Sequence, residues 1–290
     1  MKKLIRNIAP LLLAAALAAS LSACGHPQAE TPIPTPSVTQ PSAEPSPTPA
    51  PTPVPTSAPT PAPTPTPSPT PAPSAPPVSD STAASVGAGL PCTVPAGGAA
   101  DEGWFADAVF VGNSRTEGLR MYSNLAGAQF FSSVGLTVTS AFTEPCVNLD
   151  GQLLTVAEAL ERADYGKAYI MLGLNELGWV YESVFAEDYG KIIDVIRSSH
   201  PEAEIYVQSI MPVSRLKDGD GGVYTNANVV RLQRALCEMC LEKGVHYVNV
   251  AEAVQDAEGF LPDASTPDGV HLTPECCGLW ADYLKTHTGV

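Results

Sequence analysis

Basic side chains are scarce in this sequence, which has 15 Lys and Arg against 30 Asp and Glu and a formal net charge of −15 at pH 7. Residues 1–99 hold three side chains of each sign, so the whole imbalance lies in residues 100–290. An acidic surface repels phosphate backbones and anionic lipid headgroups. We therefore expect no nucleic-acid partner.

The N-terminal apolar run, residues 10–21, is too short and too rich in small residues to span a membrane comfortably. It follows three basic residues within the first six positions, which is the pattern of an export signal. The sequence Leu-Ser-Ala-Cys-Gly at 21–25 then resembles the bacterial lipoprotein signal. We expect residues 1–23 to be a signal peptide and Cys24 to carry the lipid, rather than an ordinary secretory signal with a chance cysteine. A lipid on Cys24 would anchor the protein at the outer, extracytoplasmic face of a bacterial membrane.

Residues 24–99 have almost nothing apolar to bury. Of the 30 prolines, 21 lie between Pro27 and Pro77, mostly alternating with Thr, Ser and Ala. Since proline sustains neither a helix nor a central strand, we expect a disordered stalk of polyproline-II character. A proline-rich ligand for a partner domain is the alternative. The chain thus divides into a signal peptide (1–23), a linker (24–99) and one folded domain (100–290).

The sequence also lacks the paired motifs of a zinc site. It has one Cys-x-x-Cys, at Cys237 and Cys240, with neither a second pair nor histidines at zinc-finger spacing. The two thiols are one turn apart on an expected helix, so we interpret them as small buried apolar side chains. We expect no metal. The six cysteines that follow Cys24 permit disulfides in an exported protein, and the sequence does not give their pairing.

Short apolar runs alternate with helical patterns throughout residues 100–290. Apolar runs predict strands at 109–111, 128–134, 167–172, 204–210 and 246–250. Helical spacing and capping residues predict helices at 115–125, 155–162, 185–198, 226–243 and from 273 onward. This alternation predicts an α/β fold in which helices cover both faces of a parallel sheet. Ligands of such sheets bind outside the carboxyl ends of the strands.

Ser114 lies where the first expected strand turns into a helix. Its hydroxyl would stand at the carboxyl edge of the sheet, in the positive field of a helix N-terminus. That position suits a nucleophile. However, Ser114 and Glu117 also fit the S-x-x-E capping box, and this stretch alone does not decide between the two roles.

Asp268 and His271 are three positions apart, just before the last expected helix. One tight turn would let the carboxylate of Asp268 orient one imidazole nitrogen of His271, leaving the other nitrogen free for Ser114. Acyl transfer through serine needs such a base and orienting acid, together with hydrogen-bond donors for the oxyanion. A chance pair or a helix-capping turn would give the same pattern.

Four blocks, in order along the domain, resemble those of the SGNH/GDSL hydrolase family (GDSL-like lipase/acylhydrolase). They are Gly-Asn-Ser at 112–114, Gly135 after the second expected strand, Gly-Leu-Asn-Glu at 173–176, and Asp268 with His271. The resemblance implies a three-layer α/β/α, flavodoxin-like fold with no metal or organic cofactor. It covers the expected domain and neither the signal nor the stalk.

The same resemblance assigns roles to five residues. It implies Ser114 as nucleophile, His271 as base and Asp268 as the acid that orients the base. It further implies an oxyanion hole made by the backbone N–H groups of Ser114 and Gly135 and by the side-chain amide of Asn175.

Two positions depart from the family pattern. Asn113 stands where the family has Asp before the nucleophile, and Glu176 stands where it has Asp after the third-block Asn. Neither position transfers a proton, and Asn keeps much of the local hydrogen bonding of Asp. We expect these departures to affect fine geometry and rate rather than the class of reaction.

Three more residues stand next to the four blocks in the sequence: Arg115, Trp179 and Tyr181. We expect Arg115 to be solvated or salt-bridged, rather than to hold the turn or touch substrate. Trp179 and Tyr181 follow the Asn175 block and would either wall the substrate pocket or pack in the core.

The expected function is that of a cell-surface serine esterase, carboxylesterase- or acetylesterase-like, which hydrolyses acyl esters. The predicted anchor and stalk favour O-acetyl groups on wall glycans, so the expected partners are an acylated glycan or lipid substrate and the membrane that holds Cys24. One alternative is a lipase, lysophospholipase or thioesterase of the same fold. Another is a catalytically inactive glycan-binding module, for which Asn113 is the only support in the motifs.

Overall fold

The structure, a computed structural model, describes residues 82–101 and 103–289. The predicted signal peptide, the predicted lipidation site at Cys24 and the proline-rich part of the predicted linker lie outside the described residues. Among the residues that are described, no helix is both long enough and apolar enough to cross a membrane.

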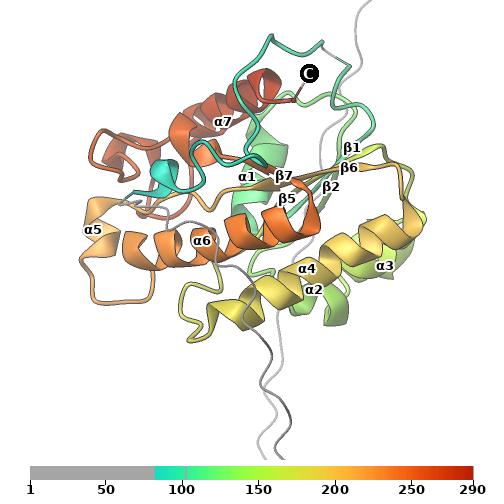
Figure 1. Ribbon diagram of the computed structural model, residues 1–290, viewed down its shortest axis with the longest axis horizontal. Helices are drawn as coiled ribbons and strands as arrows, with labels where there is room; N and C mark the ends of the chain where they lie inside the picture. Colours follow the sequence, from blue (N-terminus) through green and yellow to red (C-terminus); the bar gives the residue numbers. More distant parts are fainter. Residues whose placement is uncertain (1–81, 102, 290) are drawn as a thin grey trace, which may run out of the picture. The chain divides into compact units, whose positions relative to one another are not determined.

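A five-stranded parallel sheet forms the centre of the domain, with strand order β2-β1-β5-β6-β7 (Figure 1). Its strands are β1 (Ala108–Gly112), β2 (Gln129–Ser132), β5 (Lys167–Met171), β6 (Glu204–Gln208) and β7 (His246–Val248). All four neighbouring pairs run parallel. This order places β1, which leads to Ser114, between β2 and β5, so the loops that follow these three strands meet at one edge.

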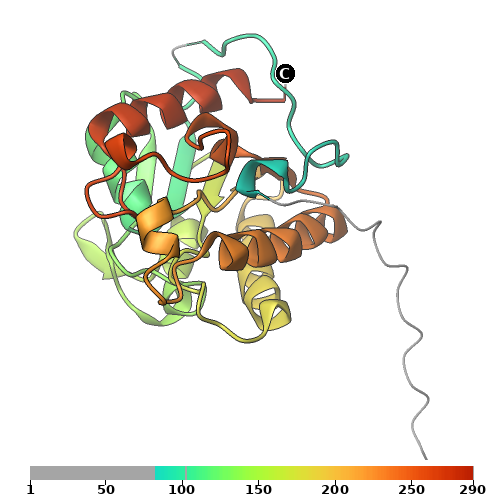
Figure 2. The same ribbon diagram turned by 90° about the vertical axis from the view of Figure 1, so that its left-hand side faces the viewer.

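Helices cover both faces of the sheet. The longer ones are α1 (Ser114–Tyr122), α3 (Val156–Arg162), α4 (Glu182–Ser199), α6 (Asn226–Lys243) and α7 (Pro274–Thr286). Helices α1 and α7 pack together on one face, while α3, α4 and α6 pack on the other. Figure 2 shows the red α7 and the orange α6 on opposite sides of the sheet. The predicted three-layer α/β/α fold is confirmed.

Shorter elements fill the connections. They are α2 (Ser140–Thr143), α5 (Arg215–Asp218), the antiparallel pair β3 (Val147–Leu149) and β4 (Gln152–Leu154), and 3₁₀ turns at Ala83–Ser85, Val250–Ala253 and Asp263–Ser265. None of these was predicted from the sequence. The predicted strand at 246–250 ends earlier, at Val248, because the chain enters the second of these turns.

The core is split by the sheet into two layers, as the alternation of side chains along a strand requires. On β1, Val109 and Val111 face α3, α4 and α6, whereas Phe110 faces α1 and α7. Phe110 lies within a row of stacked rings across the sheet, with centroids 5.2 Å from Phe130 to Phe110, 4.9 Å from Phe110 to Tyr169 and 4.5 Å from Tyr169 to Tyr206. These apolar layers fix the strands that position the loops at the carboxyl edge.

The folded domain begins earlier than predicted. Ala83 and Val86 are fully buried in the core, although the sequence assigned residues up to 99 to the linker. Thr93 forms a parallel bridge beside Tyr247 of β7, and the N–H of Val94 donates to the carbonyl of Tyr247 at 2.9 Å. The segment therefore extends the sheet at its β7 edge, and the predicted boundary at residue 100 is wrong.

The cysteines of the described part carry no disulfide. Cys237 and Cys240 are buried on α6, as predicted, and Cys276 and Cys277 are buried on α7. Across the described residues, no group of three or more His, Cys, Asp or Glu side chains is arranged to hold a metal ion.

Candidate active site

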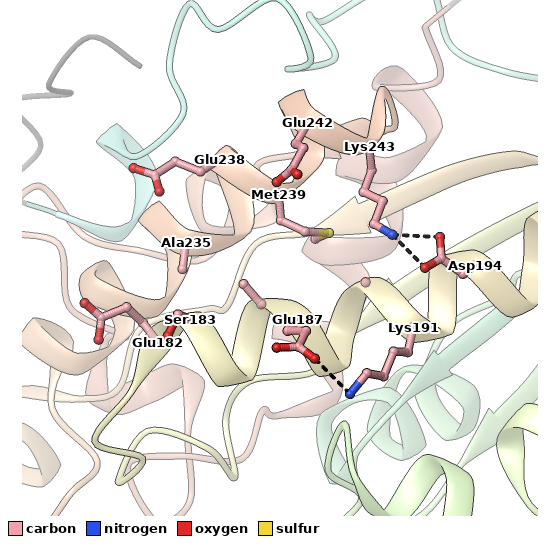
Figure 3. A pocket seen from close by; sticks show the side chains of 12 residues that line it. Glu182, Ser183, Glu187, Lys191, Asp194, Ala235, Glu238, Met239, Glu242 and Lys243 are labelled. Carbon is pink, nitrogen blue, oxygen red and sulfur yellow. Dashed lines mark hydrogen bonds and ion pairs between the residues drawn. The ribbon is translucent and has the colours of Figure 1, made fainter. Parts of the chain in front are cut away.

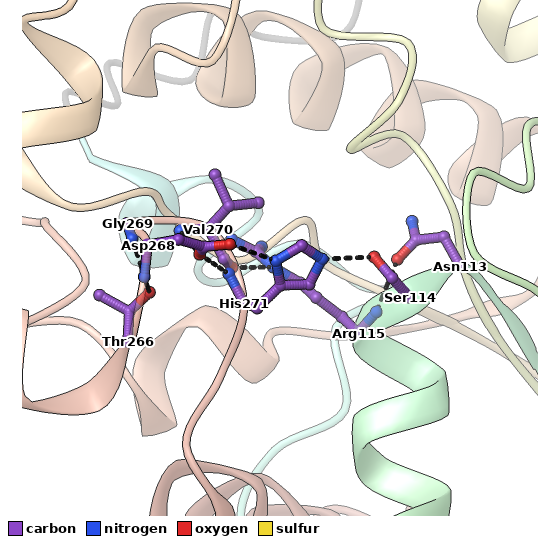
Figure 4. A network of polar contacts seen from close by, with 8 residues as sticks. All are labelled: Asn113, Ser114, Arg115, Thr266, Asp268, Gly269, Val270 and His271. Atoms are coloured by element: carbon purple, nitrogen blue, oxygen red, sulfur yellow. Dashed lines mark hydrogen bonds and ion pairs between the residues drawn. The ribbon is translucent and has the colours of Figure 1, made fainter.

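Ser114, His271 and Asp268 form one line of hydrogen bonds (Figure 4). The Nε2 atom of His271 lies 3.0 Å from the Oγ of Ser114, and its Nδ1 atom lies 2.6 Å from the Oδ2 of Asp268. The side chains of His271 and Asp268 are about half exposed, at 47% and 50%. The arrangement is therefore open to a substrate that approaches from solvent.

The turn from β1 into α1 places Ser114 as the first helical residue. Asn113, not Ser114, caps the helix, because its Oδ1 accepts the N–H of Arg115 at 3.1 Å. The capping role considered for Ser114 is thus taken by its neighbour, which leaves the Ser114 hydroxyl available to His271. A Cβ on Gly112 would lie 2.8 Å from the carbonyl oxygen of Met171, so only glycine fits before this turn.

A tight loop before α7 presents the imidazole. Oδ1 of Asp268 accepts the N–H groups of Val270 at 2.9 Å and of His271 at 2.8 Å, while its Oδ2 accepts from the ring. Gly269 adopts φ of 85°, a conformation that favours glycine. Burial alone would raise the pKa of Asp268, but the hydrogen bonds from the ring and from the two amides prevail and lower it to about 2. Asp268 is therefore a carboxylate at neutral pH.

Arg115 departs from the prediction. It is neither solvated nor salt-bridged: the side chain is only 2% exposed and its guanidinium donates to backbone carbonyls. Nε donates to Val270 at 2.9 Å, Nη1 to Met211 at 2.7 Å and Nη2 to Pro212 at 2.9 Å. Burial lowers the pKa of Arg115 to about 10, so the group remains charged at neutral pH. Arg115 holds the start of α1 against the loop that carries His271.

Gly135 and Asn175 lie on neighbouring loops at the carboxyl edge. Gly135 is exposed in the turn after β2, with φ of 82°. That turn begins beside β1, where the N–H of Ser133 donates to the carbonyl of Gly112 at 3.2 Å. The Nδ2 of Asn175 donates to the carbonyl of Leu136 at 2.8 Å, which leaves its second proton for another acceptor. The two loops that carry these two expected oxyanion donors therefore contact each other at the carboxyl edge of the sheet.

A small hollow of about 240 Å³ opens beside Ser114 and His271. Its other lining residues come from α1 and the loop before α7: Arg115, Gly118, Met121, Tyr122, Pro267 and Leu272. Neither Trp179 nor Tyr181 lines it. Trp179 is partly buried against the core, and Tyr181 is 69% exposed at the start of α4. The two aromatic residues therefore do not form a wall of this hollow.

A larger groove, about 550 Å³, lies on the opposite face of the sheet between α4 and α6 (Figure 3). Two ion pairs cross or border it, Lys243 with Asp194 at 2.7 Å and Lys191 with Glu187 at 3.3 Å. Its lining contains no serine–histidine pair. The larger of these two hollows is therefore not the one beside the candidate catalytic residues.

Comparisons with known proteins agree with the α/β/α fold described above. The sequence model of the GDSL-like Lipase/Acylhydrolase family matches residues 80–276. No curated protein sequence matches this chain. Among solved structures, a Streptococcus pneumoniae protein proposed to be a platelet activating factor is similar, with 22% identity and a TM-score of 0.50. That match covers 62% of this chain and 82% of the other, and it shows the shared fold.

Two further solved structures are similar at lower scores. Est24, a carbohydrate acetylesterase from Sinorhizobium meliloti, has 13% identity and a TM-score of 0.41, covering 61% of this chain and 96% of the other. A carbohydrate esterase family 3 protein from Talaromyces cellulolyticus has 15% identity and a TM-score of 0.43, covering 61% and 94%.

Proposed function

This chain belongs to the GDSL-like lipase/acylhydrolase family, whose members hydrolyse esters, and from that premise we propose that it is a serine esterase with Ser114 as nucleophile. The observation that carries the proposal is the hydrogen-bonded line from Asp268 through His271 to Ser114. A base within hydrogen-bond reach of the nucleophile, oriented in turn by a third group, is the arrangement that serine acyl transfer needs.

The reaction proceeds in two halves. Oγ of Ser114 attacks the ester carbonyl carbon while Nε2 of His271 takes the hydroxyl proton. The tetrahedral intermediate carries its negative charge on the former carbonyl oxygen, which accepts hydrogen bonds from the N–H groups of Ser114 and Gly135 and from Nδ2 of Asn175. The bond to the leaving oxygen then breaks, and His271 returns the proton to the alcohol. Water, deprotonated by His271, releases the acyl group from Ser114 by the same steps.

Asp268 supports both halves of the reaction. Because its pKa is about 2, it stays ionised and holds the proton on Nδ1 of His271, so that Nε2 is the nitrogen that accepts. The same carboxylate stabilises the imidazolium that forms when the proton moves.

Short acyl groups are the proposed substrates. The hollow beside Ser114, about 240 Å³, is smaller than the roughly 300–1,000 Å³ of pockets that enclose drug-sized ligands. The predicted lipid at Cys24 and the proline-rich stalk favour a location outside the cell membrane, within reach of the wall. O-acetyl groups on wall glycans combine a short acyl group with that location.

A second candidate is an esterase for longer acyl chains, a lipase, lysophospholipase or thioesterase of this fold. It is favoured by the exposed apolar side chains of Met121 and Tyr122, which line the hollow and are 59% and 49% exposed. The chain of hydrogen bonds from Asp268 through His271 to Ser114 disfavours the inactive glycan-binding module, because binding alone does not require it.

The proposal is tested with the full chain and its Ser114→Ala variant on p-nitrophenyl acetate, p-nitrophenyl palmitate and O-acetylated peptidoglycan. We expect Ser114→Ala to lose at least about 10³-fold in kcat. Ser123→Ala is the matched control, since Ser123 ends the same helix and its hydroxyl donates to the Leu119 carbonyl. Unchanged turnover in Ser114→Ala would refute Ser114 as the nucleophile. Faster release of palmitate than of acetate would favour an esterase for longer acyl chains.

A further inference from the structure

Glu176 is a fully buried acidic residue that the proposed reaction does not use. Its two carboxylate oxygens have different partners: Oε1 accepts the N–H of Val138 at 2.7 Å, and Oε2 accepts the N–H of Gly173 at 3.0 Å. Neither partner is a cation. Burying a carboxylate that is hydrogen-bonded to backbone amides but has no cation beside it costs free energy.

The two amides belong to the two loops that carry the expected oxyanion donors. Val138 follows Gly135 by three residues, and Gly173 precedes Asn175 by two. The hydrogen bond from Asn175 to the carbonyl of Leu136 joins the same two loops at a second point. Glu176 therefore lies at the junction of the turn after β2 with the loop after β5.

Glu176 accepts through both of its side-chain oxygens, because each oxygen faces a backbone N–H donor. A carboxyl group can accept at both oxygens, whereas a glutamine would turn its NH2 group toward one of the two amides. Burial raises the pKa of Glu176 to about 7 although the amides of Val138 and Gly173 lower it. The titratable group that faces it from α4 is Tyr189, which donates its hydroxyl proton to the carbonyl of Ile170 at 3.0 Å.

We propose that Glu176 is a positioning residue whose carboxylate holds the turn carrying Gly135 against the loop carrying Asn175, so that both donors face one oxyanion. The inference rests on the proposed function of Ser114. It also gives a role to the glutamate that stands where the family pattern has an aspartate.

Glu176→Gln tests the proposal in the full chain, because it keeps the size of the side chain and removes one acceptor. Removing a whole oxyanion donor costs about 10²–10³ in kcat, and a displaced donor costs less. We expect kcat for p-nitrophenyl acetate to fall by about 10-fold or more while KM stays within about twofold. Glu176→Asp retains two acceptor oxygens and is expected to recover part of the lost kcat; it also serves as the readout if the glutamine variant does not fold.

A double-mutant cycle with Asn175→Ala separates positioning from general stability. If Glu176 acts through the donors, its replacement has a much smaller effect on kcat once Asn175 is absent, because residues of one network are not additive. Additive losses would overturn the proposal. Tyr189→Phe is the matched control: it deletes another buried hydrogen bond next to Glu176, and we expect it to lower stability without lowering kcat.

Amide hydrogen exchange tests the contacts of Glu176 independently of ester hydrolysis. The N–H groups of Val138 and Gly173 should be protected in the wild type and exchange faster in Glu176→Gln. Unchanged exchange would overturn the proposal whether or not the protein hydrolyses esters. A wild type that hydrolyses no ester, with the exchange result as expected, would refute the proposed function and the oxyanion role while leaving the loop contact in place. A lower kcat with additive cycle energies would refute the positioning role alone.

Discussion

The Nε–H of Arg115 donates to the carbonyl of Val270 at 2.9 Å, which joins the residue after Ser114 to the residue before His271. Two more hydrogen bonds from the same guanidinium hold the carbonyls of Met211 and Pro212, in the loop after β6. One buried side chain thus connects three segments that are far apart in the sequence. The proposed nucleophile and its base therefore lie on segments that this side chain joins.

Arg115→Lys should be destabilising, because one ammonium cannot reach three carbonyls in the geometry of a guanidinium. Each buried carbonyl left without a donor costs about 1–3 kcal/mol, so we expect the free energy of unfolding to fall by about 2–4 kcal/mol. We also expect kcat to fall, since the loop of His271 loses its support. Urea denaturation and ester hydrolysis measure the two effects.

Arg120→Lys is the control for that substitution. Arg120 lies on the same helix, with half of its side chain exposed and paired to Glu117 at 2.7 Å. Exposed pairs of this kind contribute little, so the free energy of unfolding should change by less than about 0.5 kcal/mol. An equal loss in both variants would contradict the role given to Arg115.

Asp268→Asn should lower kcat without unfolding the loop. The asparagine Oδ1 can still accept the amides of Val270 and His271, but its other side-chain atom is an amide nitrogen that no longer accepts from Nδ1 of His271. The imidazole then loses its orienting acceptor, and we expect a loss of about 10²–10⁴ in kcat. Steady-state kinetics and circular dichroism check the two parts. A variant with full kcat would show that Asp268 does not orient the base.

Glu176 should make the protein more stable in mild acid than at neutral pH. Its ordinary pKa is 4.5 and burial raises it to about 7 in the fold, so the folded state binds the proton more tightly than the unfolded state. This contribution is fully present below about pH 4.5 and is lost as the pH rises through about 7, a change of at most about 3 kcal/mol. Denaturation at several pH values should show that this fall is absent in Glu176→Gln. If the free energy of unfolding depended on pH identically in the wild type and in Glu176→Gln, the raised pKa of Glu176 would be contradicted.

Short acyl esters should be hydrolysed faster than long ones. Because the hollow beside Ser114 is about 240 Å³, we expect kcat/KM for p-nitrophenyl acetate to exceed that for the palmitate by at least about 10-fold. Gly118 lines the hollow on α1, where an added Cβ would have only the Sγ of Cys277 nearby, at 3.5 Å. Gly118→Val should therefore reduce activity on butyrate more than on acetate, and an equal reduction would place the acyl group elsewhere.

Residues 82–99 should be required for full stability of the domain. A chain that begins at residue 100 loses the buried side chains of Ala83 and Val86 and exposes the β7 edge at Tyr247. Burial of one valine alone contributes about 1.5–3 kcal/mol, so we expect a lower melting temperature than for a chain that begins at residue 80. Equal melting temperatures would show that this segment adds nothing to the fold.

The order of strands and helices could be predicted because each element carries its own pattern. The apolar run at 109–111 and the helical spacing of 226–243 both mark elements that the structure contains. The serine, histidine and aspartate could be selected because they stand in blocks that resemble those of the SGNH/GDSL hydrolase family; their residue types and spacing alone left a cap and a chance pair open. Their hydrogen bonds in the structure match the spacing of Asp268 and His271 on one tight turn.

The role of Arg115 could not be predicted, because its partners are the backbone carbonyls of Met211, Pro212 and Val270. Every residue type has such a carbonyl, so no sequence pattern marks the partner. The same reason hides the contacts of Glu176, which end on backbone amides. The start of the domain was missed because residues 82–99 are rich in Ala, Gly and Pro, and the small side chain of Ala83 gives little apolar signal although it is buried.

The central claim is that Ser114 becomes acylated with the help of His271. The most direct measurement is peptide mass spectrometry after reaction of the full chain with a fluorophosphonate probe, in parallel with His271→Ala. We predict one adduct, on Ser114, which forms far more slowly in His271→Ala. An active esterase that is labelled on a different serine, or that reacts at the same rate without His271, would contradict the account.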